Sequence, residues 1–147
     1  EYSVYAASYG SPGNWDEEWD VTTGLNPADP LNSLLIYGIA GSYVGLVANI
    51  DVEAGVITIP PGQNIGNTYG YGDVAVYFGD EDLNIYTSTP LTGTVDAETG
   101  EINVDFWGHQ LISGDYTGFV WDVFNCSFSK TNKSGVRFVP KDKKPAN

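Results

Sequence analysis

The chain has 147 residues, of which 41% are hydrophobic and 14% aromatic, and a formal net charge of −13. This length suits a single domain and the apolar content can supply a core, so extensive disorder is excluded. All six Lys and Arg residues lie at or after position 130, whereas only one of the 19 acidic residues lies beyond position 129. Residues 1–129 are therefore purely acidic and repel phosphate, which excludes nucleic acid as a partner.

Short strands are the elements that the sequence predicts, because Gly and Pro recur too often for long helices and β-branched and aromatic residues fill the intervals. In chain order the expected strands are residues 2–9, 19–23, 34–39, 43–51, 56–59, 74–78, 85–87, 101–106, 116–128 and 136–139. About ten short strands separated by turns are typical of a barrel or a sandwich. We therefore predict one all-β domain over residues 1–140, a single antiparallel barrel of about 8–10 strands with a β-sandwich as the alternative. A polar basic tail is expected over residues 141–147.

An internal repeat is the strongest local signal. Residues 50–59 and 95–104 share the pattern apolar–Asp–x–Glu–x–Gly–x–Ile–x–apolar. A Gly after a short polar run, with apolar alternation on both sides, predicts a hairpin whose Gly has positive φ. Two β-hairpins are therefore expected. In the second, alternation places Ile102, Val104 and Phe106 on one face.

Aromatic residues in or near predicted loops are the best candidates for a ligand site. Residues 62–72 lack a sustained pattern and are predicted to be a long connection, the kind of segment that carries binding sites on a β scaffold. Exposed aromatic rings stack on sugars and on other apolar faces. The candidate ligand-binding residues are Trp15, Trp19, Tyr69, Tyr71 and Trp107. The alternative is that these rings close the ends of the core.

Catalytic and metal-binding patterns are weak. His109 is the one histidine, and without positioned partners it is interpreted as a structural or surface residue. One His and one Cys are too few for a structural zinc site. Residues 80–84 have the oxygen ligands that begin an EF-hand loop, but Ile85 and Leu91 stand where that loop needs Gly and Glu, so the motif fails. A weak calcium site of another kind in this acidic loop stays open as an alternative. No catalytic residue, metal or cofactor is therefore predicted. Cys126 is expected to be a buried small hydrophobe.

Two segments carry a resemblance to a known group of proteins. Residues 43–51 followed by 55–63, and residues 92–102, have a strand ending in Val/Ile-Asp, a Gly turn and then Ile-x-Ile-Pro-x-Gly-Gln in the first copy. This sequence pattern resembles that of small uncharacterised exported lipoproteins of Bacteroides-type bacteria, which are typically lipocalin-like (calycin-type) β-barrels or sandwiches. The resemblance implies a periplasmic or cell-surface location, through an N-terminal lipid whose cysteine lies outside this chain. That family has no catalytic residues to carry over.

Three functions follow in order of preference. The first is a non-catalytic cell-envelope barrel that binds a glycan or a small apolar ligand. The second is a structural or assembly component that binds a protein partner at the surface. The third is a small carbohydrate-active enzyme, which needs two carboxylates facing a cleft. No apolar stretch of roughly 18 residues occurs, so no helix is expected to span a membrane.

Overall fold

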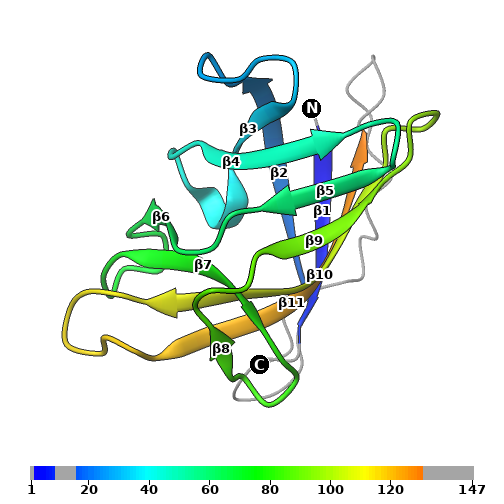
Figure 1. The fold of residues 1–147 in the computed structure, drawn as a ribbon. Coiled ribbons are helices and arrows are strands. Elements are labelled where there is room, and N and C mark those ends of the chain that lie inside the picture. The colour runs from blue at the N-terminus through cyan, green and yellow to red at the C-terminus, as the bar shows by residue number, and fades with distance from the viewer. Residues whose placement is uncertain (1, 9–15, 131–147) are drawn as a thin grey trace.

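The computed structural model describes residues 2–8 and 16–130, which form eleven strands and one short 3-10 helix (Figure 1). The strands are β1 (Tyr2–Ser8), β2 (Asp16–Leu25), β3 (Ser33–Tyr37), β4 (Leu46–Asp51), β5 (Val56–Ile59), β6 (Gln63–Gly66), β7 (Val74–Gly79), β8 (Ile85–Tyr86), β9 (Leu91–Val95), β10 (Ile102–Leu111) and β11 (Val120–Lys130). The 3-10 helix η1 (Ile39–Gly41) lies between β3 and β4. Of the predicted strands, residues 136–139 lie outside the described residues, as does the tail over 141–147.

All eleven strands belong to one sheet, and each pairing in it is antiparallel. The order is β11-β1-β2-β3-β4-β5-β9-β10-β7-β6, with β8 beside β7 and a further pairing between β11 and β10. Figure 1 shows β4, β5 and β9 side by side, with β1 and β2 crossing behind them. The predicted all-β, antiparallel architecture is confirmed, and the lipocalin-like barrel stays a prediction.

Both repeat segments form the predicted hairpins. In the first, Ile50 pairs with Ile57, and in the second, Val95 pairs with Ile102. The turn glycines, at positions 55 and 100, have φ of 70° and 77°. The two hairpins are neighbours in the sheet, because β5 pairs with β9.

A β-bulge in β10 corrects the predicted facing of Phe106. Asp105 and Phe106 together lie opposite the single residue Asn125 of β11, whose side-chain Oδ1 accepts a hydrogen bond from the Phe106 N–H at 3.2 Å. The extra residue moves the inward-facing positions by one. The buried side chains of β10 are Ile102, Val104, Trp107, His109 and Leu111. Phe106, with φ of 60°, is only partly buried.

Other boundaries also differ from the prediction. The connection over residues 62–72 contains the short strand β6, and β9 was not predicted as a strand. Residues 116–119 form a turn before β11 instead of its first residues, since Gly118 has φ of 96° and its N–H donates to the Leu111 carbonyl at 2.7 Å. This turn places Tyr116 and Phe119 at the surface.

The described core is one continuous cluster to which most of the strands contribute side chains. Its largest fully buried side chains include Trp107, Phe124 and Phe128. Cys126 is also buried, as expected for a small hydrophobe. The described buried side chains thus form one hydrophobic core beneath the loops.

A side chain completes the backbone hydrogen bonding where β4 faces β6. The Val47 N–H donates to Gln63 Oε1 at 2.8 Å, and Gln63 Nε2 donates to the Val47 carbonyl at 2.9 Å. These two bonds reproduce what a neighbouring strand would supply to Val47. Gln63 thus joins the start of β4 to β6, which itself pairs with β7.

Candidate functional site

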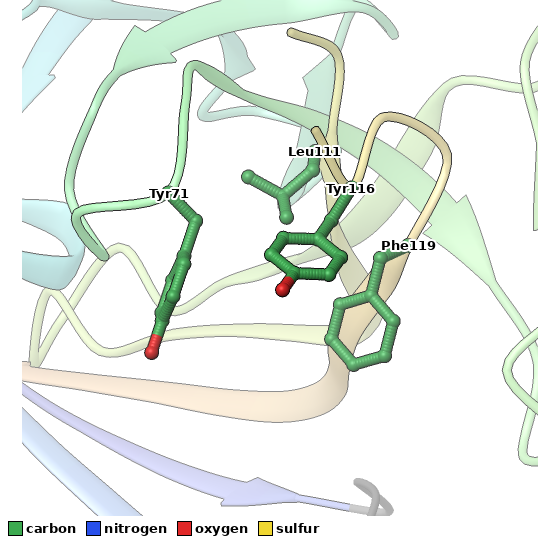
Figure 2. A pocket seen from close by; sticks show the side chains of 4 residues that line it. All are labelled: Tyr71, Leu111, Tyr116 and Phe119. Carbon is green, nitrogen blue, oxygen red and sulfur yellow. The ribbon is translucent and has the colours of Figure 1, made fainter. Parts of the chain in front are cut away.

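An aromatic groove opens between the β6–β7 loop and the end of β10 with the loop that follows it (Figure 2). We define the aromatic groove by its lining residues Tyr71, Leu111, Tyr116 and Phe119; its volume is about 310 Å³. Tyr71, Tyr116 and Phe119 are exposed by 53%, 62% and 47%. Figure 2 shows Tyr71 on one side and the other three side chains across from it. The groove thus offers large rings to the solvent over the buried Leu111.

The β6–β7 loop is shaped around the side chain of Asn67. Its Oδ1 accepts hydrogen bonds from the Gly70 N–H at 2.8 Å and the Gly72 N–H at 3.3 Å. Gly70 and Gly72 have φ of 88° and 142°, values that favour glycine. Tyr71 stands between these two glycines and is therefore held on a defined turn.

Hydrogen bonds and glycine contacts join the two loops of the groove. The Asp73 N–H donates to Ser113 Oγ at 2.8 Å, and the Ile112 N–H donates to the Asp73 carbonyl at 2.9 Å. A Cβ on Gly114 would collide with the Tyr71 carbonyl oxygen. The absence of a side chain at this position therefore lets the loops approach and sets the spacing of the groove walls.

Gly114→Ala is expected to lower the free energy of unfolding by about 2–4 kcal/mol, through a left-handed backbone that costs roughly 1–2 kcal/mol and a contact that must be relieved. Gly118→Ala is the matched control, because Gly118 also has positive φ but nothing lies within 4 Å of its added Cβ. It should lose only about 1–2 kcal/mol. Urea denaturation measures both values. Equal losses in the two variants would contradict a spacing role for Gly114.

The aromatic rings of the groove meet nearly at right angles. Tyr71 and Tyr116 have ring centroids 6.0 Å apart and an interplanar angle of 80°. An edge-to-face contact of this kind is a favourable arrangement for two aromatic rings. The pair therefore forms a preformed corner, with Phe119 beside Tyr116 (Figure 2).

A hydrogen-bonded chain of side chains links the core of β10 to the loop that carries Tyr71. The Trp107 Nε1–H donates to His109 Nε2 at 2.8 Å. Because an indole N–H only donates, Nε2 is the acceptor and the neutral ring carries its proton on Nδ1. Nδ1 lies 2.8 Å from the Tyr69 hydroxyl oxygen, so His109 donates to Tyr69. Tyr69, on the loop that carries Tyr71, is thereby tied to the core.

His109 is held neutral by its surroundings. Burial lowers its pKa from 6.5 to about 3. Trp19 stacks against the imidazole with ring centroids 6.2 Å apart, and Phe124 meets it edge-on at 5.3 Å. A second proton, on Nε2, would also break the bond from Trp107. These contacts agree with the interpretation of His109 as a structural residue.

The five candidate ligand-binding residues fall into different places. Trp15 lies outside the described residues. Trp19 and Tyr69 are partly buried around His109, and Trp107 is fully buried in β10, which fits the alternative that these rings pack on the core. Tyr71 alone among the described four lines the aromatic groove.

Tyr116 and Phe119 were missed as site residues because the alternating pattern of residues 116–128 predicted one uninterrupted strand. The signal that could have found them is the turn composition of residues 113–118, Ser-Gly-Asp-Tyr-Thr-Gly. Leu111 was missed because the bulge in β10 changes which residues face inward. This composition is typical of a turn, which places both rings on a loop.

The acidic loop over residues 80–84 is held by hydrogen bonds to one of its own carboxylates. In the loop after β7, Asp80 accepts hydrogen bonds from the N–H groups of Asp82 and Asn84 and from the Tyr86 hydroxyl. The hydrogen bond from the Tyr86 hydroxyl is the largest cause that lowers the pKa of Asp80.

Within residues 2–8 and 16–130, no three His, Cys, Asp or Glu side chains gather as metal ligands. The same residues contain no helix long and apolar enough to cross a membrane.

The chain was also compared with known proteins. No family model, curated protein or solved structure matches it.

Proposed function

We propose that this chain is a non-catalytic ligand-binding domain of the bacterial cell envelope, which takes a small ligand or glycan at the aromatic groove. The exposed rings of Tyr71, Tyr116 and Phe119 around a hollow of about 310 Å³ carry this proposal. Small-molecule sites have volumes of roughly 300–1,000 Å³ and are lined mainly by apolar and aromatic groups. Tyrosine rings supply contact area at a small cost in conformational entropy.

Rigid support for the groove favours binding. The groove loops are held by the Asp73–Ser113 hydrogen bond, and the His109–Tyr69 bond anchors the β6–β7 loop to the core. A preformed site avoids much of the entropy that binding would otherwise cost. The described residues that line the groove are three aromatic rings and a leucine, so none of these supplies the two acids that a glycosidase needs.

We infer that the sheet is a lipocalin-like barrel. The pairing order β1-β2-β3-β4-β5-β9-β10-β11 returns to β1, because β11 pairs with β1 on one side and with β10 on the other. A barrel of about eight strands has an interior just wide enough to be filled by side chains, in agreement with the continuous core. This geometry favours a ligand site at the loops. Placement at the cell envelope rests on the resemblance of the two repeat segments to exported lipoproteins.

A binding screen with matched variants tests the proposed function. We expect a neutral mono- or disaccharide, or a small apolar compound, to raise the thermal unfolding temperature of the wild-type chain in a concentration-dependent way. Tyr71→Ala and Tyr116→Ala should each weaken that binding at least about tenfold, in line with the loss of an aromatic anchor. Tyr43→Ala is the control, because Tyr43 is 97% exposed and lines a different hollow, with Asp20 and Tyr37. Binding that persists unchanged in both groove variants would overturn the assignment of the site.

An assembly role is the second candidate, favoured by apolar side chains at the β2–β3 turn. Leu25 and Leu31 are exposed by 75% and 92% there. Both side chains are available to a partner at this turn, where a contiguous apolar patch would mark an interaction site. If this turn binds a protein partner, Leu31→Ser should abolish crosslinking to that partner while leaving ligand binding at the groove intact. Crosslinking that Leu31→Ser leaves unchanged would remove the assembly role of this turn.

A further inference from the structure

The described charged residues near the aromatic groove have one sign. Residues 1–129 contain no Lys or Arg, and the charged residues nearest to the groove along the chain are Asp73 and Asp115. Asp115 directly precedes Tyr116, and adjacent Cα atoms are only about 3.8 Å apart. Its carboxylate therefore lies within the Debye length of roughly 10 Å in ordinary buffer. The field of these described carboxylates attracts cations and repels anions at the groove.

The groove walls suit a particular kind of cation. The face of an aromatic ring is the negative part of its quadrupole, and a cation placed over it is attracted. Leu111 and the three rings supply few polar atoms with which to replace the water around a small hydrated ion. A cation that is surrounded by methyl groups gives up little hydration, and it gains contact with the perpendicular rings of Tyr71 and Tyr116.

We propose that the ligand of the aromatic groove is an organic cation whose charge lies within an apolar shell, of the trimethylammonium type. The proposal rests on the proposed function of the groove as a binding site and names the class of ligand. Aromatic walls provide the contact, and the acidic surroundings of Asp73 and Asp115 select the sign of the charge. A neutral ligand of the same shape uses only the first of these two contributions.

Three probes of matched shape separate the contributions: choline, its neutral isostere 3,3-dimethyl-1-butanol, and the anion 3,3-dimethylbutyrate. Their affinities for the full chain are measured by NMR titration at low and high salt. We expect choline to bind about two- to fivefold more tightly than the neutral isostere, and the anion to bind most weakly. The advantage of choline should fall as salt is added.

Charge variants assign the selectivity to the groove. Asp115→Asn should weaken choline binding roughly twofold, as expected for one exposed charge at this range, and leave the neutral isostere unaffected. Glu81→Gln removes the same charge at the other end of β7, about 20 Å away for a strand of this length. It should change neither affinity. Tyr71→Ala should weaken the binding of both choline and the neutral isostere.

Each result has a defined meaning. Equal or tighter binding of the neutral isostere, or no measurable binding of choline, would overturn the cation as the ligand class. The groove would still stand as a binding site if a neutral probe or a saccharide depended on Tyr71. Choline binding that Tyr71→Ala leaves unchanged would place the cation elsewhere and overturn the proposal. If no ligand binds more weakly to Tyr71→Ala or Tyr116→Ala than to the wild type, the proposed function of the groove itself is overturned.

Discussion

Trp107→Ala is expected to lower the free energy of unfolding by about 4 kcal/mol or more, because it removes both core packing and a buried hydrogen bond. Truncation of a buried tryptophan or phenylalanine costs roughly 3–5 kcal/mol through lost contacts and the cavity left behind. The same change removes the only donor to His109 Nε2 shown by the described hydrogen bonds. A buried acceptor without its partner adds about 1–3 kcal/mol of destabilisation. Urea denaturation followed by far-ultraviolet circular dichroism measures the loss.

Trp107→Phe keeps the expectation testable if the alanine variant does not fold. A phenyl ring fills most of the space but cannot donate, so a loss of about 1–3 kcal/mol is expected. Tyr43→Ala provides the surface control for truncating an aromatic side chain. Since Tyr43 is almost wholly exposed, its loss should change stability by no more than about 0.5 kcal/mol. Similar losses for Trp107→Phe and Tyr43→Ala would contradict the buried hydrogen bond.

Acid is expected to destabilise the fold through His109, starting below about pH 6.5. The imidazole titrates near 6.5 when unfolded, and burial lowers its pKa to about 3 in the folded chain. Between these values the unfolded chain binds the extra proton, so acidification favours unfolding. The contribution of His109 is therefore complete above about pH 6.5 and is lost progressively as the pH falls toward 3, with a slope of about 1.4 kcal/mol per pH unit.

His109→Gln is the variant that isolates this slope. The difference in stability between wild type and variant should change by about 2 kcal/mol between pH 6.5 and pH 5. Comparing the two chains cancels the change in repulsion among the many carboxylates. Asp80 and Asp96 do not interfere, because their pKa values lie below 3.8 and their contributions are lost only at lower pH. Parallel pH profiles for the two chains would contradict a buried neutral His109.

Local signals predicted much of the sheet. Alternation located most of the described strands, and the shared Asp-x-Glu-x-Gly pattern placed both hairpins correctly, since a hairpin depends on residues that are close in sequence. The bulge at Asp105 and Phe106 was not predictable in the same way. It depends on the Asn125 side chain from another strand and on the change of partner of β10 from β9 to β7.

The candidate site was predictable only in part for the same reason. Tyr71 was named as a candidate because it lies in a glycine-rich connection, which is a local signal, and it lines the groove. Trp107 was misplaced because the bulge brings it into the core, with the Nε1–H satisfied inside by His109. The groove itself requires Tyr71 and Tyr116 to meet across two loops, and that contact depends on the glycine spacing between loops far apart in the sequence.

The adjacency of the two repeat hairpins has a consequence for colloidal behaviour. Because β5 and β9 are antiparallel neighbours, both hairpin turns emerge at the same end of the strands, two strand spacings or about 10 Å apart. The exposed carboxylates at this end are Asp51, Glu53, Asp96, Glu98 and Glu101, and the Lys130 side chain lies beside Gly100 among them. Five carboxylates against one amine leave a net negative end that repels like charges in dilute buffer, and salt screens this repulsion. The two acidic hairpins thus discourage end-to-end stacking of one copy on another at neutral pH.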